Sequence, residues 1–210
     1  MSSWIRRDFD GIGLTQAPPG PHLAAVQARY GGTVLLCIDV SWSMEGKPLR
    51  EAISGGVAFL EEADRAHYDC GLILWSRRVE RSLPPSTPLR KVIGSLRDAK
   101  LGGGTDVVPA LKRCKEIYEQ MRGDRVVCIF SDGEIPRIGA AERLARELCE
   151  MGVRIVVRGL GPKAARTLGR LTCPGGDDDT GQVIVDVADL RAGIASMAGG
   201  LTKNRRTKGK

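Results

Sequence analysis

The fold is decided by the stretch Thr33-Val34-Leu35-Leu36-Cys37-Ile38-Asp39-Val40-Ser41-Trp42-Ser43-Met44-Glu45-Gly46. Its first part is apolar and rich in β-favouring residues, which predicts a strand buried on both faces. The stretch then changes to a carboxylate and two alternating hydroxyls, at Asp39, Ser41 and Ser43. In an extended backbone, residues two apart point to the same side, so we expect these side chains to converge. They would meet at the carboxyl end of the strand, where open α/β sheets bind ligands.

These three groups offer hard oxygen atoms, which suit Mg²⁺, Ca²⁺ or Mn²⁺ rather than zinc. A second interpretation is that Asp39 and the serines only cap the helix that follows, because Asp and Ser are favoured N-cap residues. The triplet alone does not decide between a metal site and a cap.

Two later segments favour the metal site. Residues 101–106 form a glycine-rich loop that brings Thr105 and Asp106, and a second apolar strand, residues 126–130, leads into Ser131-Asp132-Gly133. Three segments far apart in the sequence therefore each end in oxygen donors. Two of these segments do so at the carboxyl end of a strand, where we expect them to meet.

The pattern Asp39-x-Ser41-x-Ser43, Gly104-Thr105 and Asp132-Gly133 resembles the metal-ion-dependent adhesion site (MIDAS) of the von Willebrand factor A-type (VWA) family. The resemblance covers about residues 31–201 and implies a complete set of metal ligands: Asp39, Ser41, Ser43, Thr105 and Asp132. It implies that the serines bind the metal directly, that the aspartates often act through waters, and that Thr105 does either. In that family, an open metal position takes an Asp or Glu carboxylate from a partner protein. We expect Mg²⁺, for its cytosolic abundance, with Ca²⁺ or Mn²⁺ as alternatives.

The residues around the predicted metal are expected to form a rim that contacts the partner. The rim comprises Trp42, Met44, Glu45, Gly104, Asp106, Gly133 and Glu134. Trp42 departs from the family, which often has a small residue at this position. Tryptophan is enriched among the residues that dominate protein interfaces, although Trp42 could instead only pack against a neighbouring loop.

The remaining chain alternates between two kinds of hydrophobic pattern. Helical periodicity predicts helices in residues 47–66, 88–96, 107–121, 141–151, 163–171 and 190–201, and apolar runs predict strands in residues 70–75, 125–131, 154–160 and 182–185. Residues 77–83 alternate charged with apolar side chains, which is typical of an edge strand. Right-handed crossovers then predict an α/β fold, a Rossmann-like, doubly wound and mostly parallel sheet with helices on both faces. Val79–Leu83 is expected to be the one antiparallel edge strand.

Length and composition predict one folded domain with two flanking segments. The 210 residues are 42% hydrophobic and 27% charged, which is ordinary for a globular chain. We expect an extended N-terminal arm in residues 1–30, the VWA-like domain in residues 31–201, and a basic, disordered tail in residues 202–210. No apolar run approaches the ~18 residues that span a bilayer, and the N-terminus lacks the apolar segment of a secretory signal. These observations predict a cytoplasmic protein, and the resemblance implies the small intracellular bacterial kind.

The net charge is +7, and five positive residues of the tail, with no acid among them, leave +2 for the rest of the chain. The body is therefore not a basic nucleic-acid surface, although the tail alone could contact nucleic acid or anionic lipid. The six cysteines form no CxxC pair, which favours reduced thiols in the core over disulfides or zinc ligands.

These observations favour a metal-dependent protein-interaction module and not an enzyme. The resemblance implies an intracellular multi-protein system, such as one with an AAA+ ATPase or a stress-resistance function. A Mg²⁺-dependent phosphatase on a doubly wound fold is an alternative, but such enzymes generally have a carboxylate where this chain has Ser41. A nucleic-acid-associated VWA protein is the third hypothesis, and the near-neutral body and 4% aromatic content disfavour it.

Overall fold

The computed structural model describes residues 31–133, 135–174, 181–184, 186–198 and 201. These residues form one sheet with the strand order β3-β2-β1-β4-β5-β6. The strands are β1 (Gly32–Asp39), β2 (Tyr68–Trp75), β3 (Val79–Leu83), β4 (Asp124–Ser131), β5 (Val153–Leu160) and β6 (Gly181–Ile184). All neighbouring pairs are parallel except β2 and β3, which are antiparallel. The predicted α/β class, and its antiparallel edge strand, are confirmed.

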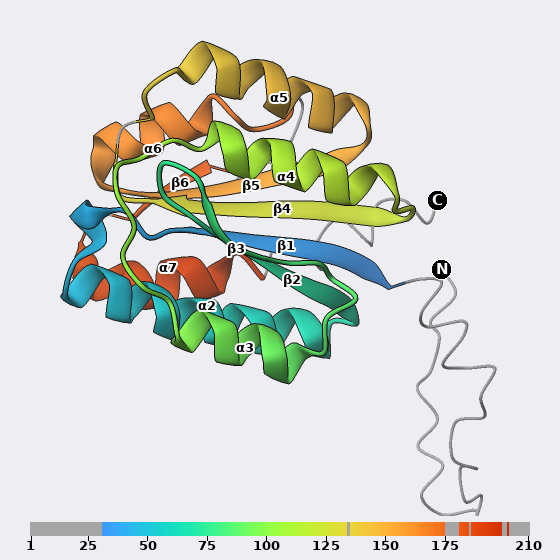
Figure 1. Ribbon diagram of the computed structural model, residues 1–210, viewed down its shortest axis with the longest axis horizontal. Coiled ribbons are helices and arrows are strands. Elements are labelled where there is room, and N and C mark those ends of the chain that lie inside the picture. The colour runs from blue at the N-terminus through green and yellow to red at the C-terminus, as the bar shows by residue number, and fades with distance from the viewer. Residues whose placement is uncertain (1–30, 134, 175–180, 185, 199–200, 202–210) are drawn as a thin grey trace, which may run out of the picture.

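Helices cover both faces of the sheet (Figure 1). One face carries α2 (Lys47–Arg65), α3 (Leu89–Arg97) and α7 (Leu190–Ser196), and the other carries α4 (Val108–Glu119), α5 (Ile138–Glu150) and α6 (Gly161–Gly169). Two short 3₁₀ helices, η1 (Trp42–Met44) and η3 (Val187–Asp189), complete the described elements. This doubly wound arrangement is the one that the alternating hydrophobic patterns predict.

Strand β1 lies at the centre and is buried on both faces. Val34, Leu36 and Ile38 pack in the hydrophobic core under α2, whereas Leu35 and Cys37 pack in the second core under α4. The alternation follows from the two-residue period of a strand. Complete burial of each large aliphatic side chain stabilises the folded state by about 1.5–3 kcal/mol. The apolar run of β1 packs into both cores, and this packing holds Asp39, at the end of the strand, in a fixed position.

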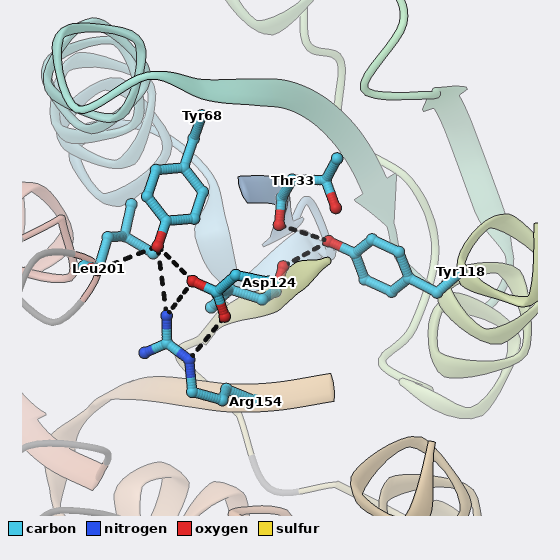
Figure 2. Close-up of polar contacts among 7 residues, drawn as sticks. Thr33, Tyr68, Tyr118, Asp124, Arg154 and Leu201 are labelled. Atoms are coloured by element: carbon cyan, nitrogen blue, oxygen red, sulfur yellow. Dashed lines mark hydrogen bonds and ion pairs between the residues drawn. The ribbon is translucent and has the colours of Figure 1, made fainter. Parts of the chain in front are cut away.

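A polar cluster fastens the amino edge of the sheet (Figure 2). The Tyr68 hydroxyl lies 2.5 Å from Oδ2 of Asp124 and 3.0 Å from the carbonyl oxygen of Leu201. Nη2 of Arg154 donates to the same Asp124 oxygen at 2.8 Å. The cluster joins the starts of β2, β4 and β5 to the C-terminal part of the domain. These contacts are at the edge of the sheet opposite to the carboxyl ends of β1 and β4, where Asp39 and Ser131 lie.

The expectation of six reduced cysteines is wrong for one pair. Cys149 and Cys173 form a disulfide, with their Cα atoms 5.6 Å apart. The reason is tertiary: the end of α5 and the loop after α6 come within the distance that a disulfide spans, which a separation of 24 residues in sequence does not reveal. The other four cysteines are free and buried, as expected.

Several predicted features lie outside the described residues. They are the arm in residues 1–30, the tail in residues 202–210, and the rim residue Glu134. Within the described residues, the search for a helix with the length and hydrophobicity of a membrane span finds none.

Candidate metal centre

The candidate site lies where the chain changes direction across the sheet. From β1 the chain builds β2 and β3 on one side, and it then returns to place β4 on the other side of β1. Asp39 ends β1, Ser131 ends β4, and the preceding residues, Ile38 and Phe130, are paired in register. Doubly wound folds bind ligands in the crevice at such a switch point, outside the carboxyl ends of the strands. The loop of residues 101–106 approaches the same edge, because the Gly102 amide donates to the Val40 carbonyl at 2.7 Å.

Four of the five predicted ligands belong to one hydrogen-bonded network. Oδ1 of Asp39 accepts from the backbone amide of Ser41 at 2.8 Å, and Oδ2 accepts from the Ser131 hydroxyl at 2.6 Å. The hydroxyls of Ser41 and Ser43 are 3.0 Å apart. Ser43 then donates to Oδ1 of Asp132 at 2.8 Å. Oxygens from the ends of β1 and β4 are therefore within a few ångströms of one another.

The fifth predicted ligand, Thr105, comes from the glycine-rich loop. Gly104 has a φ of +67°, a left-handed conformation that glycine adopts at little cost. The amide of Asp106 donates to the Ser76 carbonyl at 2.9 Å, which fixes the end of the loop against the end of β2. A Cβ atom placed on Gly133 would lie 3.6 Å from Oγ1 of Thr105 and 4.0 Å from Oγ of Ser131. Thr105 thus lies beside the Asp132-Gly133 segment, and the three segments meet.

The side chains of Ser41 and Ser43 converge through a tight turn and not, as predicted, through an extended backbone. Ser43 does not continue β1 in an extended conformation but lies in η1. Residues two apart in a strand are separated by about 6.5 Å along it, whereas the tight turn brings the hydroxyls of Ser41 and Ser43 to 3.0 Å. Ser41 occupies the N-cap position of η1 but makes no side-chain capping bond. The capping interpretation therefore does not account for its hydroxyl.

The two carboxylates at this site lie in an unfavourable electrostatic environment. The pKa of Asp39 is raised from 3.8 to about 6, chiefly by loss of hydration and to a smaller extent by the nearby charge of Asp132, while hydrogen bonds from Ser131 and Ser41 oppose the rise. Loss of hydration also raises the pKa of Asp132, which the hydrogen bond from Ser43 opposes. Among the described residues, neither carboxylate has an ion-pair partner. A bound cation would supply the positive charge that the protein does not.

The donor set fits a hard divalent cation. It combines two carboxylates with three hydroxyls, and oxygen donors of this kind suit Mg²⁺, Ca²⁺ and Mn²⁺. Within the described ranges, no group of three or more His, Cys, Asp and Glu side chains could hold a metal. Metal binding at this edge would therefore depend on the hydroxyls of Ser41, Ser43 and Thr105, together with Asp39 and Asp132.

The predicted rim divides into exposed and engaged residues. Trp42 is 62% exposed and is the one large hydrophobic side chain on the surface of the described part of the chain. Glu45 is also exposed, and Gly104 and Gly133 border the site. The expected place of Met44 on the rim is wrong, because the turn of η1 directs its side chain into the core, where it is fully buried.

Asp106 is engaged within the protein rather than presented to a partner. Its Oδ1 accepts from the amide of Val108 at 3.1 Å, at the start of α4, and its Oδ2 pairs with Arg137. The carboxylate therefore ties the glycine-rich loop to the segment that follows β4. Arg137 makes this contact from a left-handed backbone conformation, with a φ of +41°.

Two residues at the site, Ser131 and Arg77, were not predicted from the sequence. Ser131 holds the Asp39 carboxylate, and its position at the end of β4 was the available signal once β4 is placed beside β1. Arg77 borders the glycine-rich loop from the turn between β2 and β3. A Cβ atom placed on Gly104 would lie 3.2 Å from Nε of Arg77. No local sequence pattern distinguishes Arg77 from an ordinary exposed arginine.

Comparisons with known proteins agree with this architecture. Residues 34–134 match the family model described as von Willebrand factor type A domain, a segment that contains all five predicted ligands. A search of curated proteins found no match.

Solved structures with the same fold come from several sources. The domain of the type V pilus tip protein Mfa5 from Porphyromonas gingivalis is 14% identical, with a TM-score of 0.73, and the match covers 83% of this chain and 96% of that domain. A von Willebrand factor type A protein from Catenulispora acidiphila is 14% identical with a TM-score of 0.67, covering 80% of this chain and 42% of that one. Proximal thread matrix protein 1 from the mussel byssus, with a zinc-occupied MIDAS motif, is 14% identical with a TM-score of 0.61, covering 80% and 46%. The chain thus spans less than half of the last two proteins. The family match and the shared fold support a VWA domain.

Proposed function

We propose that this domain is a complete MIDAS module, which binds one divalent cation and presents it to the carboxylate of a partner protein. The observation that carries the proposal is the hydrogen-bonded network of oxygens from the ends of β1 and β4, with Thr105 beside it, around two carboxylates that have no ion-pair partner among the described residues. VWA domains are interaction modules that bind partners through such a metal, which supports the same assignment.

Each donor has a distinct role in this proposal. Ser41 and Ser43 bind the cation through neutral hydroxyls, Thr105 binds directly or through water, and Asp39 and Asp132 act mainly through waters. Neutral hydroxyls leave most of the cation's charge uncompensated, so the cation attracts one further anionic oxygen. This contact is stronger than an exposed salt bridge, which contributes about 0–1 kcal/mol. We propose Mg²⁺ as the ion, while zinc occupies the corresponding motif in the mussel protein.

The environment of Asp39 favours a binding role over phosphatase chemistry. Both oxygens of its carboxylate accept hydrogen bonds, from Ser41 and Ser131, so the group is held in place rather than free to attack a phosphate. Ser41 stands where the phosphatase mechanism needs a second carboxylic acid. His67, the one histidine in the described part of the chain, precedes β2 and lies at the opposite edge of the sheet. We therefore propose a non-enzymatic module.

We propose separately that the domain acts within a multi-protein assembly. The resemblance suggests a place in a multi-protein assembly of the cytoplasm, for example with an AAA+ ATPase. The Cys149–Cys173 disulfide weighs against the cytoplasm, since disulfides persist mainly in oxidising compartments.

The test is affinity capture in MgCl₂ followed by elution with EDTA, using a lysate of the source cells. A specific partner should elute with EDTA from the unaltered protein and should not bind Ser43→Ala. Ser86→Ala is the matched control, because Ser86 is exposed in the turn before α3. Partners that stay bound in EDTA, or that bind Ser43→Ala equally, would contradict a metal-dependent interaction.

A further inference from the structure

A pocket adjoins the candidate metal centre without including any of its five proposed ligands. It has a volume of about 610 Å³. Its walls are the side chains of Trp42, Arg77, Arg78, Glu80 and Leu101, together with the glycines of the 101–106 loop. The pocket thus combines an exposed indole with two arginines, at the turn between β2 and β3.

The pocket and the metal centre share the same backbone. Trp42 lies between Ser41 and Ser43, and its Nε1 is 3.7 Å from the Cβ position of Gly103. The amide of Arg77 donates to the carbonyl of Gly103 at 3.0 Å, two residues before Thr105. A ligand that reaches the cation from this side therefore passes over Trp42 and the glycine-rich loop. Because Gly103 and Gly104 have no side chains, Trp42 and Arg77 can lie close to the loop on either side of this path.

The charges in the pocket are not balanced. Glu80 accepts from the Ser76 hydroxyl at 2.6 Å and pairs with Arg78 at 3.3 Å, so its charge is compensated within the protein. Arg77 is exposed and has no carboxylate partner among the residues that the structure describes. Two arginines face one glutamate, which leaves one positive charge to attract an anion.

We propose that this pocket binds a second acidic side chain of the same protein partner whose first carboxylate reaches the cation. Arg77 pairs with the second acid, and Trp42 packs against the stretch of peptide between the two acids. The occupant is thus a peptide segment with two acids at a fixed spacing. This inference rests on the proposed function, since the metal holds the first acid. It adds the source of specificity, because the metal alone would accept any accessible carboxylate.

The experiment uses a phage-displayed library of random short peptides, selected on the full chain in MgCl₂ and eluted with EDTA. The expected pool carries one acid in every peptide and a second acid at a constant spacing. Selection on Arg77→Glu should lose the second acid or replace it with Lys or Arg. Arg146→Glu is the matched control, because Arg146 is exposed on α5, and it should return the original pool.

Synthetic peptides from the pool give the quantitative test. Arg77→Ala should weaken the two-acid peptide about two- to fivefold, as expected for a partly exposed ion pair. Arg77→Ala should not change the affinity for the same peptide in which the second acid is replaced by its amide. Comparing the four affinities in this double-mutant cycle isolates the contribution of the ion pair.

The outcomes separate the two proposals. The pocket assignment would be overturned if the peptides eluted by EDTA carried only one acid, or apolar residues in place of the second acid, and if selection on Arg77→Glu returned the same peptides. The metal site would still be supported by that result. A pool that EDTA does not elute would overturn the proposed function, and the pocket assignment with it.

Discussion

The buried charge of Asp39 makes the metal-free protein less stable than it would be with a neutral group. The pKa of Asp39 rises from 3.8 to about 6 on folding, chiefly through loss of hydration. Each pKa unit corresponds to about 1.4 kcal/mol, so at pH 7 the ionised carboxylate costs about 3 kcal/mol. Because the folded state binds the proton more tightly, stability is highest below pH 4 with respect to this group and falls as the pH rises to about 6.

The perturbation that tests this is Asp39→Asn. The amide has the shape of the carboxylate and can still accept from the Ser41 amide, but the hydrogen bond from Ser131 must reverse. With about 1 kcal/mol allowed for that change, the metal-free variant should be about 2 kcal/mol more stable than the original at pH 7. The difference should shrink as the pH is lowered, pass through zero between about pH 4 and 5, and reverse below that, because only the cost of the reversed hydrogen bond then remains.

Bound metal should reverse the order of stability. A cation present at a hundred times its dissociation constant stabilises the folded protein by about 2.7 kcal/mol, and Asp39→Asn should lose most of this gain. Urea denaturation in EDTA and in MgCl₂, over pH 4–8, measures both effects. Asp69→Asn is the control, since Asp69 is exposed on β2. Lower stability of Asp39→Asn than of the original protein in EDTA at pH 7, or equal stabilisation of both proteins by Mg²⁺, would refute the reasoning.

Three further predictions concern the ligands, the disulfide and the amino edge. Ser43→Ala should reduce Mg²⁺ affinity at least about tenfold, measured by the Mg²⁺ dependence of the thermal midpoint; an unchanged midpoint shift would exclude Ser43 as a ligand. Thiol titration of the denatured, unreduced protein should find four reactive groups, and six would show that Cys149 and Cys173 are reduced. Reducing this disulfide should lower stability by up to about 3 kcal/mol, seen as a lower urea midpoint. Tyr68→Phe should cost about 1–2 kcal/mol by leaving Asp124 with one partner fewer, while a stability equal to the original would show that the hydroxyl contributes nothing.

The helices and strands could be predicted from the sequence because each depends mainly on the hydrophobic pattern of its own segment. The apolar run that opens β1, interrupted at Asp39, is enough to predict a strand buried on both faces and its end. The charged alternation around Val79–Leu83 similarly predicts an edge strand. The mostly parallel sheet with helices on both faces also follows, since right-handed crossovers and short connections leave few alternatives.

The sequence could not predict features that depend on tertiary contact. Met44 was assigned to the rim because it follows the predicted ligand Ser43 in the sequence, yet one turn of 3₁₀ helix directs its side chain into the core. The Cys149–Cys173 bond depends on where α5 and the loop after α6 meet. Arg77 borders the site only because the β2–β3 turn lies over the glycine-rich loop. In each case the information lies in how the elements pack, not in the spacing of residues along the chain.

Anomalous diffraction from crystals soaked in MnCl₂ tests the central claim most directly. The account predicts one manganese peak at the carboxyl ends of β1 and β4, bonded to the hydroxyls of Ser41 and Ser43, with at least one coordination position open to solvent or to a neighbouring carboxylate. Manganese bound elsewhere, with these hydroxyls still hydrogen-bonded to each other and to Asp132, would contradict it.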